Sequence, residues 1–167
     1  MEPQEEFASL FERMYQLCNE NNWGDPFNYS RAREIHMANT LGHQLADNYS
    51  GADAIDQDGE CEYKSTISPK INATYNGISV KPTWEEQVLY LQNEKIGKYH
   101  NHYYARYQQG TIVEIYKMTG EKVLDYAIPK LETKYNGQRG ADPRLGICIP
   151  HNYITQNAEL IFPVTVV

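Results

Sequence analysis

A tight-turn signal at residues 56–59, Asp-Gln-Asp-Gly, is the feature that most restricts how this chain can fold. Strand-like runs flank the turn at 52–56 and 60–67, which predicts that they pair as a hairpin. Two further β-rich runs around a Gln-Gln-Gly turn predict a second hairpin, in which 100–107 pairs with 111–118. We therefore expect a sheet that contains at least these two hairpins.

Segments with helical periodicity alternate with these strands. The clearest is 4–19, where apolar residues recur along one face of an amphipathic helix. Ser30 is typical of a helix N-cap and predicts a second helix that runs to about Ala46. The remaining expectations are a polar loop at 68–82, helices at 84–97 and 121–135, a strand at 145–149, and an edge strand at 161–167.

This interleaving predicts an α/β (α+β) fold, with one central mixed sheet flanked by helices and preceded by an N-terminal helix. We expect a helical segment at 1–29 and a main domain at 30–167. No run approaches the roughly 18–20 apolar residues of a membrane helix, and the acidic N-terminus lacks the plan of a secretory signal. A cytoplasmic protein is therefore expected, with buried free thiols at Cys18, Cys61 and Cys148.

The net charge of −7 is unevenly distributed. Residues 1–62 hold thirteen acidic and three basic side chains, whereas residues 63–167 hold nine acidic and twelve basic ones. An acidic cluster can hold divalent cations, and a basic half can face phosphates. The charge pattern thus permits a nucleic-acid partner.

The first hairpin carries an unusual row of charged residues. Side chains alternate along a strand, so Glu60, Glu62 and Lys64 share one face. Folding of the hairpin can bring Asp53 near Glu62, and two converging carboxylates suit Mg²⁺. A lysine on the same face would reach a metal-bound water or a phosphate. Asp56 is expected to serve the turn instead, and Glu60 to be a solvated edge residue.

The segment Asp53-Ala-Ile-Asp56 followed by Glu60-Cys-Glu62-Tyr-Lys64-Ser65 resembles the active-site hairpin of the PD-(D/E)xK nucleases, and within them the PvuII-type type II restriction endonucleases. The resemblance implies Mg²⁺-dependent hydrolysis of phosphodiester bonds in double-stranded DNA by a homodimer. It implies that Asp53 and Glu62 hold metal, that Glu34 contacts a metal or its waters, and that Lys64 acts on the attacking water. The alternative for Glu34 is a first-turn charge favoured by the helix dipole. The chain departs from the family in having Gly51-Ala52 in place of the leading proline, and in lacking a base-reading histidine cluster.

Polar residues in the 68–82 loop and near 142–152 are the candidates for DNA contact, because their side chains offer donors and acceptors to base edges. They are Lys70, Asn72, Thr74, Tyr75, Asn76, Arg144, His151 and Asn152. Helix 4–19 is the expected dimer surface, with packing onto its own core as the rival. The tyrosines of 99–107 resemble stacking platforms for single strands, but their alternation fits a half-buried sheet better. Arg31, Arg33 and His36 form either a phosphate patch or a solvated helix face.

Two alternative functions remain open on the sequence. The same active site would serve a structure-selective nuclease, such as a junction resolvase or repair enzyme. A non-catalytic DNA-binding module could also keep the scaffold, although such a module has no reason to retain Asp53, Glu62 and Lys64 together.

Overall fold

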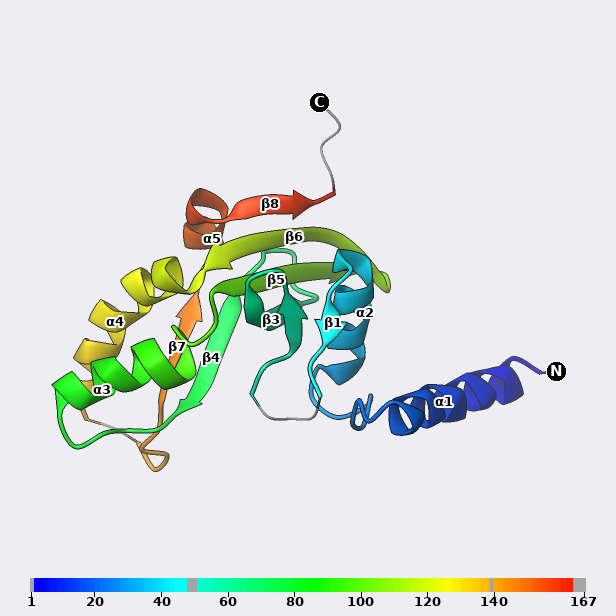
Figure 1. The fold of residues 1–167 in the computed structure, drawn as a ribbon, viewed down its shortest axis with the longest axis horizontal. Coiled ribbons are helices and arrows are strands. Elements are labelled where there is room, and N and C mark those ends of the chain that lie inside the picture. Colours follow the sequence, from blue (N-terminus) through cyan, green and yellow to red (C-terminus); the bar gives the residue numbers. More distant parts are fainter. Residues whose placement is uncertain (1, 48–50, 139, 164–167) are drawn as a thin grey trace.

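A six-stranded mixed sheet forms the centre of the protein in the computed structural model, which describes residues 2–47, 51–138 and 140–163. The strands lie in the order β1-β2-β3-β5-β6-β8 (Figure 1). Their bounds are Gln44–Leu45, Ala54–Asp56, Gly59–Thr66, Asn101–Gln108, Thr111–Thr119 and Glu159–Phe162. The α/β fold with a mixed sheet, flanking helices and an N-terminal helix is thus confirmed.

Both predicted hairpins are present. The β2–β3 hairpin pairs Ala54 with Cys61 and closes at Asp56 and Gly59. The β5–β6 hairpin is longer and contains one register shift, at Arg106/Tyr107. The hairpins are joined by β3 and β5, which run parallel, so the segment between them must cross over the sheet.

A separate two-stranded ribbon lies in that part of the fold. β4 (Ala73–Ile78) comes from the crossover and pairs antiparallel with β7 (Leu145–Ile149). The crossover also contains α3 (Trp84–Tyr90), which continues into a π-helical turn, η1 (Leu91–Lys95). The other helices are α1 (Pro3–Glu20), α2 (Arg31–Leu41), α4 (Gly120–Asn136) and α5 (His151–Asn157).

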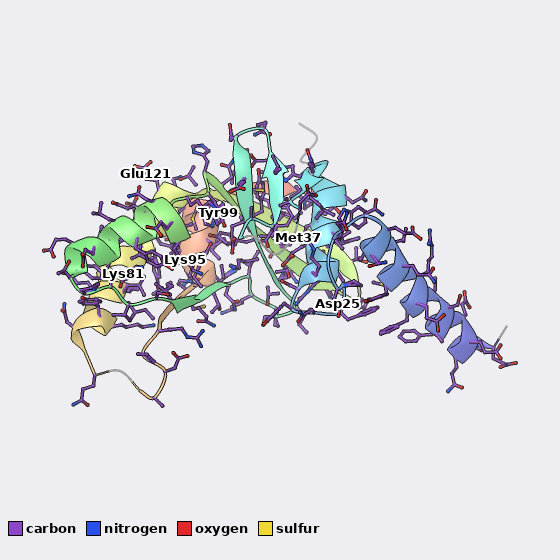
Figure 2. The ribbon with its side chains drawn as sticks, turned by 60° about the horizontal axis from the view of Figure 1, so that its bottom comes forward. Asp25, Met37, Lys81, Lys95, Tyr99 and Glu121 are labelled. Atoms are coloured by element: carbon purple, nitrogen blue, oxygen red, sulfur yellow. The ribbon has the colours of Figure 1, made fainter. Side chains whose placement is uncertain are left out.

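The sheet has a buried cluster on each face, and the alternation in β5 separates them. Tyr103 packs in a cluster with Met37 of α2, whereas its neighbour Tyr104 packs in a cluster with residues of α4 and of the β4–β7 ribbon. Figure 2 labels Met37 beside the sheet. In β3, Cys61 and Tyr63 point to the α2 side, so the side chains between and after them face the ribbon side.

Helix α1 extends away from the rest of the protein (Figure 1). Within this fully described helix only Cys18 is buried. Its large apolar side chains are exposed, from 38% for Leu17 to 71% for Phe7. Midway along the helix, the rings of Phe11 and Phe27 stack with their centroids 3.8 Å apart. The amphipathic helix is confirmed, and apart from this contact its apolar side chains remain largely exposed within the described part of this chain.

Several predictions of local structure were wrong. The polar loop at 68–82 contains β4, and α5 was not predicted. The second helix ends at Leu41 because Gly42 adopts a left-handed conformation, which stops a helix. Cys148 is exposed, unlike Cys18 and Cys61. The predicted edge strand begins earlier, at Glu159, and its last residues, 164–167, lie outside the described residues.

Among the described residues, no helix combines the length and the apolar character that crossing a membrane would require.

Candidate active site

The β2–β3 hairpin fixes the position of Asp53 through its backbone and its side chain. The Asp53 amide donates to the carbonyl of Cys61 over 3.1 Å. In return the Tyr63 amide donates to Oδ2 of Asp53 over 2.7 Å. The Tyr63 amide on the neighbouring strand thus fixes the Asp53 carboxylate. Asp53 therefore lies opposite Glu62, the residue between Cys61 and Tyr63.

Glu62 and Lys64 lie on the ribbon side of β3. The Lys64 ammonium forms an ion pair with Oε1 of Glu62. Their side chains are 15% and 27% exposed, so the pair is largely shielded but still open to a ligand. The Lys64 ammonium also lies 5.0 Å from the centroid of the Tyr75 ring, which comes from β4.

The carboxylates repel one another. Burial, followed by the charges of Glu62 and Glu34, raises the pKa of Asp53 from 3.8 to about 8. Burial alone would lower the pKa of Lys64, but the charges of Glu62, Asp53 and Glu34 outweigh it and raise the pKa. The neighbouring carboxylates therefore disfavour a charged Asp53 and favour a charged Lys64.

Glu34 faces Asp53 from helix α2 but is held by other groups. Its carboxylate accepts from Ser30 over 2.7 Å and forms an ion pair with the buried Arg31 at 3.2 Å. Glu34 and Asp53 both line a hollow of about 200 Å³. Because its oxygens are already bonded, Glu34 is better placed to contact a metal through water than directly.

The donor set fits Mg²⁺ with two protein carboxylates. In the described residues, no group of three or more His, Cys, Asp or Glu side chains is arranged to hold a metal ion. Mg²⁺ commonly binds through one or two carboxylates and completes its shell with water and substrate phosphate oxygens. Asp53 and Glu62 supply that pair, and the mutual repulsion of their charges is what a bound cation would relieve.

Asp56 has a structural role. Its Oδ2 accepts from Tyr103 over 2.7 Å and from the buried Asn101 over 2.8 Å, and Oδ1 accepts from the Asp58 amide. Burial would raise the pKa of Asp56, but these hydrogen bonds outweigh it and lower the pKa. Asp56 thus closes the turn and ties the hairpin to β5.

Two residues that the sequence analysis left out border the site. Tyr99 is buried, and a side chain at Gly51 would lie 2.9 Å from its hydroxyl. Burial, followed by the charges of Glu62 and Glu60, raises the pKa of Tyr99. Lys98 forms an ion pair with Glu60 at 3.4 Å. Figure 2 labels Tyr99 near the middle of the molecule. Their position follows from the parallel pairing of β3 with β5, which no local signal revealed.

The predicted DNA-contacting residues divide into two groups. Thr74, Asn76 and Arg144 line one hollow of about 620 Å³, which is bordered by the outer face of the β4–β7 ribbon and by Thr133 and Lys134 near the end of α4. Asn76 lies against Gly146, where an added side chain would be 2.6 Å from its amide oxygen, and Arg144 extends over Gly77.

The other predicted contacts are less well placed. Tyr75 was wrongly predicted as a DNA contact: strand alternation turns its side chain inward, where it is 5% exposed. Lys70 is exposed and Asn72 half-buried in the loop before β4. His151 and Asn152 begin α5, and neither lines the hollow. The Nδ1 atom of His151 is buried without a hydrogen-bond partner.

Comparison with known proteins adds no family. No protein-family model matches this chain, and no curated protein matches its sequence. We therefore base a function on the side-chain geometry and on the motif within residues 51–65.

We predict that Asp53→Asn and Asp56→Asn change the stability of the metal-free protein in opposite directions. Asp53 has a raised pKa, so its carboxyl group binds a proton more tightly in the folded protein than in the unfolded chain. The folded protein therefore loses stability as the pH rises from about 4 to about 8. At pH 8 in EDTA, Asp53→Asn should therefore be more stable than wild type by about 1–2 kcal/mol in urea unfolding.

Asp56 has a lowered pKa, so its contribution is present above its unfolded pKa and is lost as the pH falls below it. Asp56→Asn should destabilise the protein by about 1–3 kcal/mol at pH 8, because it weakens hydrogen bonds to buried donors. Equal destabilisation by both variants would contradict the assignment of the two aspartates.

Proposed function

We propose that this protein is a Mg²⁺-dependent DNA endonuclease of the PD-(D/E)xK type, acting as a type II restriction endonuclease on double-stranded DNA. The observation that carries the proposal is the convergence of Asp53, Glu62 and Lys64 on one hairpin. Two neighbouring carboxylates that disfavour one another's charge, beside a largely shielded ammonium, form a site suited to a divalent cation and a phosphate.

Each residue then has a distinct role in phosphodiester hydrolysis. Asp53 and Glu62 would hold Mg²⁺, which when bound withdraws charge from the phosphate oxygens. Lys64 orients the attacking water and favours its deprotonation through the ammonium charge. The water oxygen bonds to phosphorus and its proton passes to solvent, while the bond from phosphorus to the leaving oxygen breaks and that oxygen takes up a proton from solvent. Glu34 orders water on the Asp53 side of the hollow.

The outer face of the β4–β7 ribbon is the proposed base-reading surface. The major groove of DNA admits a two-stranded β-ribbon, and asparagine and arginine can each bond two atoms of one base. Thr74, Asn76 and Arg144 lie together on that face. The carboxylate of Asp142 forms an ion pair with the guanidinium of Arg144 at 2.7 Å. This polar row favours sequence reading over recognition of a branched structure.

The exposed face of α1 is the proposed homodimer surface. One chain holds one Asp53/Glu62/Lys64 set, and cutting both strands of a palindrome is simplest with two sets related by a two-fold axis. The apolar stripe of Phe7, Leu10, Phe11, Met14 and Leu17 is exposed along one side of the helix. Pairing of two such stripes would remove them from water.

We expect Lys64→Ala to abolish cleavage of plasmid DNA while binding to a cleavable duplex persists. The ammonium acts in the transition state and is one of many phosphate contacts, so its loss should lower the rate by at least about 100-fold. Cleavage is read on gels, and binding by anisotropy in Ca²⁺. Near wild-type cleavage would contradict the proposal.

For active wild type, discrete plasmid fragments support sequence reading, and cutting of branched substrates alone supports the structure-selective alternative.

Metal exchange provides a separate prediction. Mg²⁺ should support cleavage, whereas Ca²⁺ should support DNA binding alone, because the two ions share oxygen ligands but differ in size and in coordination geometry. The measurement is cleavage in each metal at matched concentration, with EDTA as the blank. Undiminished cutting in EDTA would exclude metal-dependent hydrolysis.

The dimer prediction is tested by paired charge variants of α1. Sedimentation of wild type should give twice the 19.3 kDa chain mass. The variant Leu10→Glu with Met14→Glu should sediment as a monomer, because it places charges in the apolar stripe. The control, Ser9→Glu with Gln16→Glu, adds the same charge to the opposite side of the helix and should remain dimeric. A wild-type monomer on palindromic DNA would contradict the proposal.

A further inference from the structure

Tyr75 lies on the boundary between the ribbon and the catalytic lysine. Its neighbours Thr74 and Asn76 are exposed on the outer face of β4, whereas its own ring points inward and is 5% exposed. The Lys64 ammonium stands 5.0 Å from the centroid of that ring, within the range of a cation–π contact. Among the described residues, Lys64 therefore contacts both the Glu62 carboxylate and the face of Tyr75.

A buried hydrogen-bond chain holds the ring in place. His102 is fully buried, and its Nε2 lies 3.0 Å from the carbonyl of Ile96. A carbonyl only accepts, so Nε2 carries the proton. Burial lowers the pKa of His102 to about 4, so the ring is neutral at neutral pH and its Nδ1 is an acceptor.

The direction of the chain follows from that tautomer. The Tyr75 hydroxyl donates to Nδ1 of His102 over 2.8 Å. Its oxygen then accepts from the Tyr104 hydroxyl, also over 2.8 Å. Tyr75 is thus held at its hydroxyl by two fully buried side chains, while its ring face is left for Lys64.

We propose that Tyr75 is a positioning residue, whose ring face keeps Lys64 in place when Glu62 binds metal. This inference rests on the proposed nuclease function. In the metal-free protein, Oε1 of Glu62 holds the Lys64 ammonium. A metal ion competes for that same carboxylate and repels the ammonium. The Tyr75 face does not bind Mg²⁺, so it remains attractive to Lys64 at the step where the lysine is needed.

Three variants distinguish a role of Tyr75 in positioning Lys64 from a role in stabilising the protein core. Tyr75→Phe keeps the ring but leaves His102 without its donor and Tyr104 without its acceptor. Tyr75→Leu removes the ring as well. Tyr104→Phe is the matched control, because it breaks the same chain and leaves Tyr75 bonded to His102. All three should be less stable than wild type, so rates are measured well below every unfolding temperature.

The expected order of rates differs from the order of stabilities. In single-turnover cleavage with Mg²⁺, Tyr75→Phe and Tyr104→Phe should stay within about threefold of wild type, since the ring face persists. Tyr75→Leu should be slower by about 30-fold or more, with DNA binding in Ca²⁺ changed by less than about threefold. A purely structural role predicts that the rates follow stability instead, and equal rates for Tyr75→Leu and Tyr75→Phe would overturn the proposal.

A second measurement does not depend on cleavage. Protons held over an aromatic face resonate upfield, so the ε-methylene signal of Lys64, identified by its loss in Lys64→Arg, should be shifted upfield in wild type and in Tyr75→Phe. The shift should persist when Mg²⁺ is added and should vanish in Tyr75→Leu. Loss of the shift on adding Mg²⁺ to wild type would overturn the proposal. An inactive wild type that retains the shift would instead count against the nuclease function alone.

Discussion

The repulsion between Asp53 and Glu62 is the constraint around which the centre of this protein is arranged. The hairpin forces the two carboxylates together, because the Tyr63 amide holds Asp53 in place and strand alternation directs Glu62 to the ribbon side. A core built only for stability would not keep that contact. Burial, followed by the charges of Glu62 and Glu34, raises the pKa of Asp53 to about 8, so a charged Asp53 is unfavourable at this position. Unfavourable charge retained inside a packed fold is a common mark of a functional site.

The surrounding side chains limit the unfavourable charge interaction to Asp53 and Glu62. Asp56, three residues from Asp53, accepts hydrogen bonds from Tyr103 and Asn101, so its charge is favoured where that of Asp53 is not. Arg31 is buried and neutralises Glu34 at the edge of the hollow. Asp53, just before β2, and Asp56, at its end, therefore have opposite electrostatic environments, which is the basis for proposing Asp53 rather than Asp56 as a metal ligand.

Local signals predicted the parts of the fold that depend on neighbouring residues. The Asp58-Gly59 turn, the alternation of Glu62 and Lys64, and the periodicity of helix 4–19 are all short-range, and each appears in the structure. The missed features depend on distant partners. β4 is a strand because β7, some 70 residues later, pairs with it, and its Asn- and Gly-containing sequence resembles a loop. Tyr75 reaches the site through the pairing of β4 with β7, and Tyr99 through the parallel pairing of β3 with β5.

Strand β4 has two proposed roles, DNA contact and positioning of Lys64, and they fall on adjacent residues. Residues 74 and 76 face the hollow at which bases would be read, and residue 75 faces the lysine that would act on the phosphodiester bond. A strand is stiff over three residues, so a displacement of its outer face moves the inner side chain as well. Two hydrogen bonds to buried partners oppose that displacement. The Tyr75 ring can hold Lys64 only while β4 keeps its register with β7. The ribbon that would contact DNA thereby also determines whether Lys64 stays over the Tyr75 ring.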